Sequence, residues 1–240
     1  MVDRFSFDGT PEIGMKRGAK VIQADANRSI ARNIGLEHCS SKAVLFVDSD
    51  MVISSGVLED CIAGLEEHEA LVIPEVSIGH GFWATCKAME RKTNQGDSLI
   101  EAPRCFRRSA LLSLGGYNPS LEAGEDWDLS IRAKRGNLVV GRIESSILHD
   151  YGDSVLITTL RKKYNYGKSM QRYFKSHART TIRQLNPVRR ILLPGLKGVI
   201  SDPVHGFGLI FLKTAEFTAA GAGSLTVVLK RSRQSSPSNL

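Results

Sequence analysis

Two carboxylates that follow a short apolar run are the residues of this chain best placed to do chemistry. Residues 43–47 are apolar, and Asp48, Ser49 and Asp50 come directly after them. A continuous apolar run predicts a strand covered on both faces, as in a parallel sheet, and ligands of open α/β sheets bind outside the carboxyl ends of such strands. Two neighbouring carboxylates repel each other unless a cation joins them, and their oxygens suit Mg²⁺ or Mn²⁺. The pattern therefore indicates a metal site, with an ordinary polar turn as the alternative.

Further segments with a distinctive pattern are spread along the chain. In order they are VDRFSFDGT at 2–10, RSIARNIG at 28–35, RCFRR at 104–108, GGY at 115–117, GEDWDL at 124–129 and a late His149. Asp-Ser-Asp after an apolar strand resembles the DxD motif of GT-A glycosyltransferases, and the other segments resemble family 2 of these enzymes. The resemblance runs from residue 2 to roughly residue 175. One such motif would be a weak signal, but six in family order are a specific one.

This resemblance implies a fold, a reaction and its partners. We expect an α/β chain with the GT-A fold of nucleotide-diphospho-sugar transferases, built on a mainly parallel sheet. The implied reaction is an inverting transfer of a sugar, in which Mn²⁺ or Mg²⁺ neutralises the leaving diphosphate and a base takes the proton of the acceptor hydroxyl. The implied partners are a nucleotide-diphospho-sugar donor and a glycan or polyprenyl-phosphate-linked acceptor.

The start of the chain departs from the family pattern. Family members usually have a strand, a PxYN-like turn and a helix before the segment similar to residues 2–10, whereas this sequence starts inside that second strand. We therefore expect the first strand–helix unit, which supplies part of the nucleotide base pocket, to be missing. The chain is expected to bind its donor poorly, and restoring upstream coding sequence is expected to restore activity. The alternative is a shortened, inactive member that binds a membrane or a partner.

Three residues are the candidate metal ligands. The resemblance makes Asp50 the main ligand and Asp48 a second carboxylate that contacts the metal or the ribose of the donor. His149 is the expected third ligand, because it follows the strand-like residues 143–148 and matches the late histidine of the family. An ordinary loop histidine is the alternative for His149. Imidazole tolerates Mn²⁺ better than Mg²⁺.

The candidate base is Asp126. An acidic cluster before a predicted helix is, on its spacing alone, a cap and a complement to the helix dipole. The resemblance reverses this reading, because the second residue of the family's ED pair is the usual base. The like-charged neighbours Glu125 and Asp128 are expected to raise the proton affinity of the cluster, and Asp128 is the less favoured alternative base.

Other residues are candidates for binding the two substrates. Asp3 and Asp8 resemble residues around the nucleoside pocket, and Asp3 is the better candidate for the base ring. Arg28 and Arg32 lie four apart, on one face of a predicted helix, where one of them is expected to meet phosphate. The expected acceptor side comprises Trp83, Arg104, Phe106, Glu125 and Trp127, with core packing as the alternative for Trp83.

Composition and charge divide the chain into two parts and a tail. Strand and helix signals alternate over residues 1–152, the expected GT-A-like catalytic domain, with helices predicted at 28–38 and 57–67 and a strand at 70–76. Residues 153–230 are the expected basic and amphipathic helical region, because no Asp or Glu lies between Asp153 and Asp202 and eleven Lys or Arg lie from Arg161 to Lys197. Residues 231–240 are the expected disordered tail. The net charge of +7 favours anionic partners.

The C-terminal region also predicts where the protein acts. Basic residues lead into an apolar stretch at 206–229, broken by Lys213 and Glu216, which suggests peripheral contact with an anionic membrane surface. Four scattered cysteines and no apolar leader suit a cytoplasmic protein, at the inner face of the cell membrane. Nucleic acid is not an expected partner, because the basic residues are confined to one late segment. A haloacid-dehalogenase-like phosphatase is a remote alternative for the acidic strand end, and no P-loop sequence is present.

Overall fold

The computed structural model describes residues 1–153 and 155–234 of the 240-residue chain. The strands are β1 (Val2–Asp3), β2 (Ile22–Gln23), β3 (Ala43–Leu45), β4 (Met51–Ile53), β5 (Ala70–Val72), β6 (Glu75–His80), β7 (Cys105–Arg107), β8 (Val140–Arg142) and β9 (Ile147–Asp153). The helices are α1 (Thr10–Lys16), α2 (Arg28–Glu37), α3 (Val57–Glu67), α4 (Phe82–Asn94), α5 (Arg108–Ser113), α6 (Glu125–Arg135), α7 (Leu156–Gln184), the π-helix η1 (Val188–Leu192), α8 (Leu193–Ser201) and α9 (Pro203–Gln234). Of the predicted tail at 231–240, residues 231–234 continue α9, and 235–240 lie outside the described residues.

The strands form three small sheets rather than the predicted mainly parallel one. Their orders are β1–β2, β3–β7–β5–β8 and β4–β9–β6. The α/β class is confirmed, but the pairing is mixed, with three parallel and three antiparallel pairs. The difference arises because β7 runs opposite to both of its neighbours, β3 and β5, and β9 runs opposite to β4.

The strand before the two carboxylates is shorter and more exposed than the sequence predicts. β3 is the first strand of its sheet and pairs antiparallel with β7, and the backbone N–H of Phe46 extends the pairing with a hydrogen bond of 2.9 Å to the Arg104 carbonyl. Val44 is buried, whereas Ala43 and Val47 are exposed. Val44 lies in one core cluster and Leu45, on the opposite face, packs against another, but both ends of the run are exposed. The strand is therefore covered less completely than the predicted burial on both faces.

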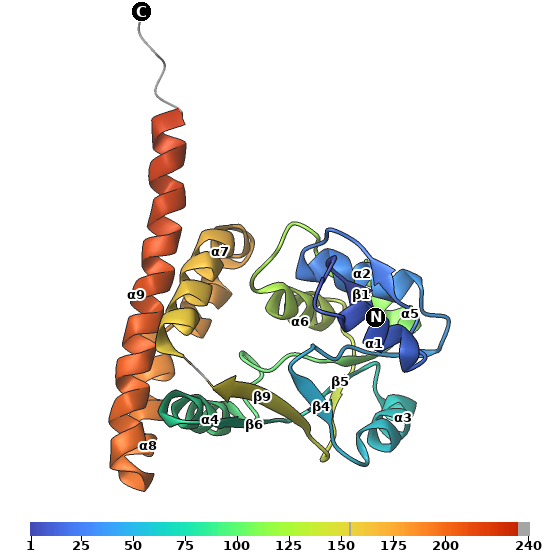
Figure 1. Cartoon of the computed structure of the whole chain (residues 1–240), viewed down its shortest axis with the longest axis horizontal. Helices are drawn as coiled ribbons and strands as arrows, with labels where there is room; N and C mark the ends of the chain where they lie inside the picture. Colours follow the sequence, from blue (N-terminus) through green and yellow to red (C-terminus); the bar gives the residue numbers. More distant parts are fainter. Residues whose placement is uncertain (154, 235–240) are drawn as a thin grey trace, which may run out of the picture.

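The C-terminal helices pack on one side of the molecule. Helices α7, α8 and α9 lie together beside α4, away from the N-terminal unit of β1 and α1 (Figure 1). Glycines let α7 and α9 approach closely, because a side chain at Gly167 would collide with the Ala220 backbone and one at Gly223 with the Tyr164 backbone. Leu209 and Leu212 of α9 are buried against Cys86 of α4. One side of the apolar stretch at 206–229 is therefore a helix-packing face.

Two charged residues of that stretch are part of this packing. Lys213 of α9 is buried, and its Nζ lies 2.9 Å from Glu90 Oε1 of α4 and 2.7 Å from Glu216 Oε2. Arg190 of η1 lies 3.1 Å from the same Glu90 oxygen, and Lys163 of α7 lies 3.5 Å from Glu216. These charges join α4, η1, α7 and α9. No helix of the described residues is long and apolar enough to cross a membrane.

Replacing Glu90 by Gln should weaken the attachment of the C-terminal helices. The variant leaves Lys213 and Arg190 without their shared carboxylate, so we expect the free energy of unfolding near neutral pH to fall by about 3 kcal/mol. Burial opposes ionisation of Glu90, but Lys213 and Arg190 outweigh it and lower the pKa of Glu90 from 4.5 to about 2. A lowered pKa stabilises the fold above pH 4.5, and that contribution is lost as the pH falls towards 2.

Urea denaturation at neutral pH and at about pH 3 measures both effects. The difference between wild type and Glu90→Gln should shrink on acidification, and the exposed Glu66→Gln is the matched control. A Glu90→Gln variant as stable as wild type at neutral pH would contradict this role of the buried charges.

Candidate active site

Pairing of β4 with β9 brings the second carboxylate of the motif to the late histidine. Met51 lies opposite His149, and the backbone N–H of Asp150 donates a 2.8 Å hydrogen bond to the Asp50 carbonyl. The side chains meet as well, with His149 Nε2 3.2 Å from Asp50 Oδ2. Asp50 is 45% exposed at its side chain, so this pair opens to solvent on the Asp50 side.

The first carboxylate of the motif has different partners. Asp48 accepts hydrogen bonds from Arg32 Nη2 at 3.0 Å and from Arg104 Nη1 at 3.2 Å. Burial opposes ionisation of Asp48, but the two guanidinium groups outweigh it and lower the pKa of Asp48. The cations that meet Asp48 are therefore arginines, and the structure does not bring Asp48 together with Asp50 and His149.

Arg32 links this strand end to the acidic helix start. It projects from α2, which begins at Arg28 after Asn27, whose side chain accepts a hydrogen bond from Ile30 N–H. The Arg32 side chain is only 7% exposed, and Nη1 lies 2.5 Å from Asp126 Oδ1 and 3.4 Å from Glu125 Oε1. The same guanidinium therefore holds Asp48 and Asp126 side by side, although the two residues lie far apart in the sequence.

Glu75 extends the network from the arginines to the histidine. Its Oε1 accepts from Arg104 Nε at 2.9 Å, and its Oε2 lies 2.7 Å from Arg91 Nη1 and 3.2 Å from His149 Nδ1. Burial opposes ionisation of Glu75, but His149 and the two arginines lower its pKa to about 2. The sequence analysis did not select Glu75 or Arg91; an acidic residue within the otherwise apolar predicted strand at 70–76 was the signal for Glu75.

The two aspartates of the acidic helix differ in exposure and partners. Asp126 is about one third exposed at its side chain. Asp128 is buried, and its carboxylate oxygens lie 2.7 Å from His177 Nε2 and 2.8 Å from Arg132 Nε. Asp128 thus ties α6 to α7, and the structure gives no access to it as a base. Burial first, and then the neighbouring Asp126, raise the pKa of Glu125.

The candidates for the nucleoside and phosphate have local partners. Asp3 is buried and accepts from Ser6 N–H at 2.9 Å and Gln23 Nε2 at 3.2 Å, and hydrogen bonds from Ser6 lower its pKa. Asp8 is exposed and accepts from Thr10 N–H at the start of α1.

Both terminal nitrogens of the Arg28 guanidinium already have partners within the protein. It donates to Glu125 Oε1 at 3.0 Å and to the Tyr166 hydroxyl at 2.9 Å. Burial lowers the pKa of Arg28, but Glu125 and Tyr166 together raise it by more.

Two of the five residues predicted for the acceptor side, Phe106 and Trp83, are packing residues, and the role of the other three stays a prediction. Phe106 is fully buried in the core with Val44 and Leu111, because β7 lies between two other strands. Trp83 packs in the α4–α9 interface with its ring 6.0 Å from that of Phe211, so the packing alternative holds.

The other three acceptor candidates, Trp127, Arg104 and Glu125, have hydrogen-bond or ion-pair partners within the protein. Trp127 donates from Nε1 to the Ile100 carbonyl at 3.0 Å and lies 5.9 Å from the Tyr173 ring. Arg104 and Glu125 belong to the charged network.

Comparisons with known proteins agree with the family resemblance of the sequence motifs. Residues 1–112 match the model of glycosyl transferase family 2. A mannosyltransferase of Pyrobaculum calidifontis, PcManGT with GDP-Man and Mn²⁺, is similar in structure at a TM-score of 0.57 and 15% identity, over 93% of this chain and 76% of that one. S. aureus TarS 1–349 with UDP-GlcNAc matches at a TM-score of 0.52 and 17% identity, over 98% of this chain and 83% of that one. No curated protein matches the sequence.

These findings confirm the predicted family and the GT-A fold, and with them the class of enzyme, a glycosyltransferase. The fold excludes the haloacid-dehalogenase-like alternative. Asp48, which would be the nucleophile of such a phosphatase, is also held between Arg32 and Arg104.

A divalent cation, which GT-A enzymes commonly use, fits the glycosyltransferase site at one place. No group of three or more His, Cys, Asp and Glu side chains in the described part of the chain is arranged to hold a metal by itself. Asp50 and His149 nevertheless supply one carboxylate and one imidazole within 3.2 Å of each other. This donor set suits Mn²⁺, and two protein ligands leave coordination positions for substrate phosphates.

Proposed function

We propose that this chain is a metal-dependent, inverting glycosyltransferase. It would move a sugar from a nucleotide-diphospho-sugar donor to a glycan or polyprenyl-phosphate-linked acceptor at a membrane surface. The observation that carries the proposal is the charged network in which Arg32 joins Asp126 to Asp48, while Asp50 and His149 meet at the other end. The candidate base and the cation-binding pair are thereby held in fixed positions by one hydrogen-bonded network. Transfer between two bound substrates requires such fixed positions.

Asp126 is the group that we assign as the base. Its carboxylate has one oxygen on Arg32 and is about one third exposed, so it can reach an acceptor hydroxyl. Asp128 and Glu125 are both buried and held by other residues. Asp50, the more exposed carboxylate of the network, is assigned to the cation. Asp126 is then left to act as base, with no second carboxylate assigned as nucleophile, which favours direct displacement and therefore inversion at the sugar carbon.

The donor's diphosphate would lie beside Asp50. A cavity of about 220 Å³ opens there, and its charged lining consists of three aspartates, Asp50, Asp150 and Asp153, and two lysines, Lys87 and Lys162. The two lysines can neutralise anionic oxygens, and a divalent cation on Asp50 and His149 would add Lewis-acid stabilisation of the leaving group. The complexes of PcManGT with GDP-Man and Mn²⁺ and of TarS with UDP-GlcNAc support this donor class. Asp3 and Asp8 stay our candidates for the nucleoside.

A donor screen tests the proposed reaction. The purified chain is incubated with GDP-mannose, UDP-GlcNAc and other nucleotide sugars, with and without Mn²⁺, and with polyprenyl phosphate as acceptor. We expect nucleoside diphosphate release that depends on acceptor and Mn²⁺, and a product of inverted anomeric configuration. A folded chain that releases nothing with any donor would favour the alternative of a family member that binds a membrane or partner without turnover.

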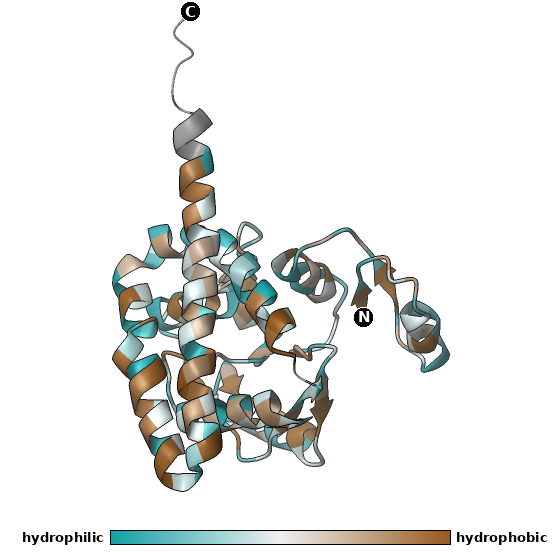
Figure 2. Cartoon of the chain, turned by 60° about the vertical axis from the view of Figure 1, so that its left-hand side comes forward, coloured by the Kyte–Doolittle hydropathy of each residue, from teal (hydrophilic) through white to brown (hydrophobic). Residues whose placement is uncertain are grey.

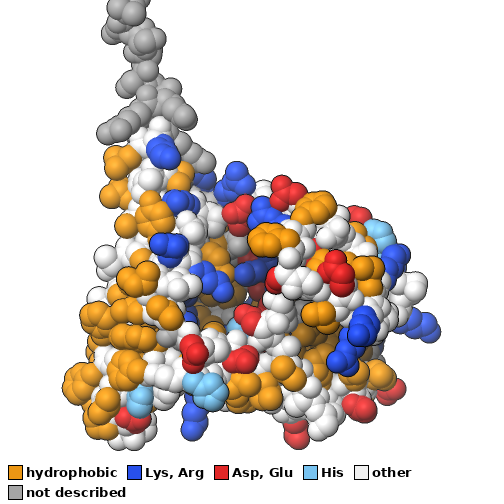
Figure 3. Space-filling view, viewed as in Figure 1, with side chains coloured by type: hydrophobic (Ala, Val, Ile, Leu, Met, Phe, Trp, Pro, Cys, Tyr) orange, Lys and Arg blue, Asp and Glu red, His pale blue; other side chains and the backbone are white. Residues whose placement is uncertain are grey.

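The membrane surface enters the proposal through an apolar ridge. We define the ridge as Leu192, Leu193, Leu196, Ile200, Val204 and Phe207, which are 47–85% exposed and follow one outer face of η1, α8 and the start of α9. The hydropathy colours mark this end of α8 and α9 as hydrophobic (Figure 2), and apolar side chains gather over the same helices in the space-filling view (Figure 3).

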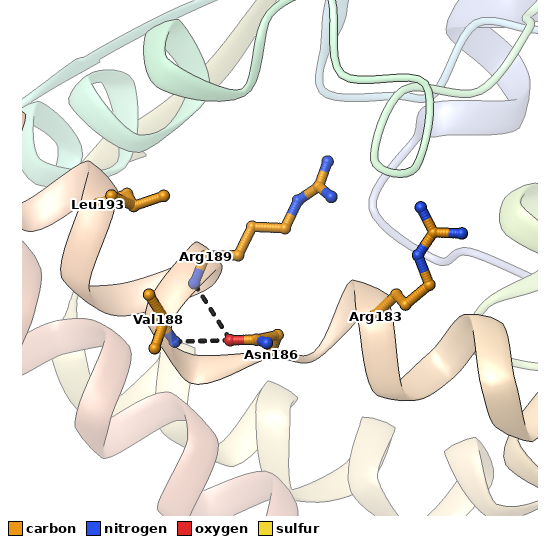
Figure 4. A pocket seen from close by; sticks show the side chains of 5 residues that line it. All are labelled: Arg183, Asn186, Val188, Arg189 and Leu193. Atoms are coloured by element: carbon orange, nitrogen blue, oxygen red, sulfur yellow. Dashed lines mark hydrogen bonds between the residues drawn. The ribbon is translucent and has the colours of Figure 1, made fainter.

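Cations flank the ridge on its inner side. A pocket of about 240 Å³ is lined by Arg183, Asn186, Val188, Arg189 and Leu193, so it shares a residue with the ridge. The side chains of Arg183 and Arg189 extend in the same direction (Figure 4), and Arg189 also pairs with Asp97. Basic side chains beside an exposed apolar face are typical of helices that lie in the headgroup region of anionic membranes. We therefore assign an anionic bilayer to the ridge, on the cytoplasmic side of the cell membrane.

Replacing Ile200 and Phe207 by Asp should release the protein from vesicles. Both side chains are more than half exposed, so the fold is spared, while two apolar contacts with the bilayer are lost and two repulsive charges are added. We expect at least about a tenfold loss of binding, since burying one such side chain contributes about 1.5–3 kcal/mol. Flotation with phosphatidylcholine vesicles, with and without phosphatidylglycerol, measures the loss.

Ile62→Asp on α3 is the matched control, because Ile62 is 66% exposed and lies outside the ridge. Binding should also need phosphatidylglycerol and weaken at high salt. A wild-type chain that dimerises and does not float would assign the ridge to a second copy instead.

A further inference from the structure

Both ring nitrogens of His149 face a carboxylate, and Nδ1 also faces a guanidinium. Nε2 lies 3.2 Å from Asp50 Oδ2, on the side where we place the cation. Nδ1 has two neighbours at nearly equal distance, Glu75 Oε2 at 3.2 Å and Arg91 Nη2 at 3.3 Å. A carboxylate only accepts a hydrogen bond and a guanidinium only donates one, so Nδ1 can satisfy one neighbour but not both.

The choice at Nδ1 decides what Nε2 can do. If Nδ1 carries the proton and donates it to Glu75, the lone pair of neutral Nε2 is free to bind a cation. If Nδ1 instead accepts from Arg91, the proton must sit on Nε2, which then donates to Asp50 and cannot bind a cation. Only the tautomer selected by Glu75 is therefore competent.

We propose that Glu75 is a positioning residue that holds His149 in the Nδ1–H tautomer, the form in which Nε2 can bind a divalent cation. This inference rests on the proposed function where it concerns the cation. The sheet supports it, because β6 and β9 are parallel with Ser77 opposite His149, which places Glu75 on the same face one pleat earlier. Arg104 fixes the carboxylate from the other side, through a 2.9 Å bond from Nε to Oε1.

The partners of Arg91 explain why Glu75 prevails at Nδ1. Arg91 Nη1 is engaged with Glu75 Oε2 at 2.7 Å, and Nη2 donates to the Tyr151 hydroxyl at 3.0 Å. Tyr151 also stacks on the imidazole, with ring centroids 4.6 Å apart, which limits rotation of the His149 ring. The Nη2 group of Arg91 thus has another acceptor, and Glu75 Oε2, with two lone pairs, can accept from both Arg91 Nη1 and His149 Nδ1–H. A carboxylate behind a ligating histidine also raises the basicity of that ligand.

Nitrogen NMR of metal-free, ¹⁵N-labelled protein tests the tautomer directly. Protonated and unprotonated ring nitrogens give well-separated signals, so the spectrum shows which nitrogen carries the proton. The His149 signals are assigned by their absence in His149→Gln. We expect the proton on Nδ1 in the wild type. A proton on Nε2 in the wild type would overturn the proposal without any variant.

Two variants that break the same ion pair separate positioning from general structure. Glu75→Gln places an amide against Nδ1 and should move the proton to Nε2, whereas Arg91→Gln should leave it on Nδ1. Mn²⁺ affinity, read from the electron paramagnetic resonance signal of free Mn²⁺, should fall about 10–100-fold in Glu75→Gln and less than about threefold in Arg91→Gln. Glu75→Asp, which restores the carboxylate, should recover part of the loss.

The outcomes distinguish this inference from the proposed function. Equal losses of Mn²⁺ affinity in Glu75→Gln and Arg91→Gln, with the tautomer unchanged in both, would reduce Glu75 to an ordinary ion-pair partner. The expected tautomers in a wild type that binds no Mn²⁺ would instead uphold the role of Glu75 and contradict the metal site of the proposed function.

Discussion

Asp126→Asn is expected to lower the rate of sugar transfer by about 10²–10⁴-fold, while the donor binds nearly as well as to wild type. The amide keeps the size of the side chain, and its oxygen can still accept from Arg32, so the frame that holds Asp48 and Asp126 survives. What is lost is the group that takes the acceptor proton in the transition state. A change of this kind lowers kcat and leaves ground-state binding intact. Transfer assays and calorimetric donor titration measure the two effects, with the donor that the screen identifies.

Glu122→Gln is the matched control for Asp126→Asn, because Glu122 is an exposed carboxylate four residues earlier in the chain. It should keep the rate of wild type. Asp128→Asn separates stability from chemistry, since it weakens the buried contact with His177 and should lower the free energy of unfolding. Retention of full activity by Asp126→Asn, with the activity lost instead in Asp128→Asn at a temperature where that variant is folded, would move the base to Asp128.

Local patterns predicted most of the secondary structure. The helices at 28–38 and 57–67 and the strand at 70–76 correspond to α2, α3 and β5, because caps and apolar spacing act within one segment. Strand direction was not predictable in this way. β7 and β9 enter their sheets against a neighbour, and nothing in a three-residue or seven-residue segment fixes its orientation. The same limit applies to the apolar run at 43–47, because how far its side chains are buried depends on which strands lie beside it.

For the candidate site, the sequence predicted which residues take part better than which of them contact one another. Asp48, Asp50, Asp126 and His149 were selected, and the charged network contains all four. The sequence did not predict that Asp48 pairs with arginines while Asp50 meets His149. The Asp48 pairs depend on Arg32 from α2 and on Arg104, the residue before β7. Glu75 was missed because its partners come from three distant segments. Lys213 and Glu216 were read as breaks in an apolar stretch, although Lys213 attaches α9 to Glu90 of α4 and Glu216 attaches it to Lys163 of α7.

Asp50→Asn should abolish most Mn²⁺ binding, whereas Asp48→Asn should leave it nearly unchanged. Asp50 meets His149 at 3.2 Å and is open to solvent, so it is the carboxylate of the motif available to a cation. Loss of a ligand should lower Mn²⁺ affinity at least as much as loss of an outer partner, by about 100-fold or more. Asp48 is already neutralised by Arg32 and Arg104, so Asp48→Asn should instead lower the free energy of unfolding, by about 1–3 kcal/mol for a pair that is partly exposed. Titration of free Mn²⁺ by electron paramagnetic resonance and urea denaturation measure both quantities in each variant. The opposite result, with Mn²⁺ binding lost in Asp48→Asn and kept in Asp50→Asn, would mean that a bound cation displaces the arginines from Asp48.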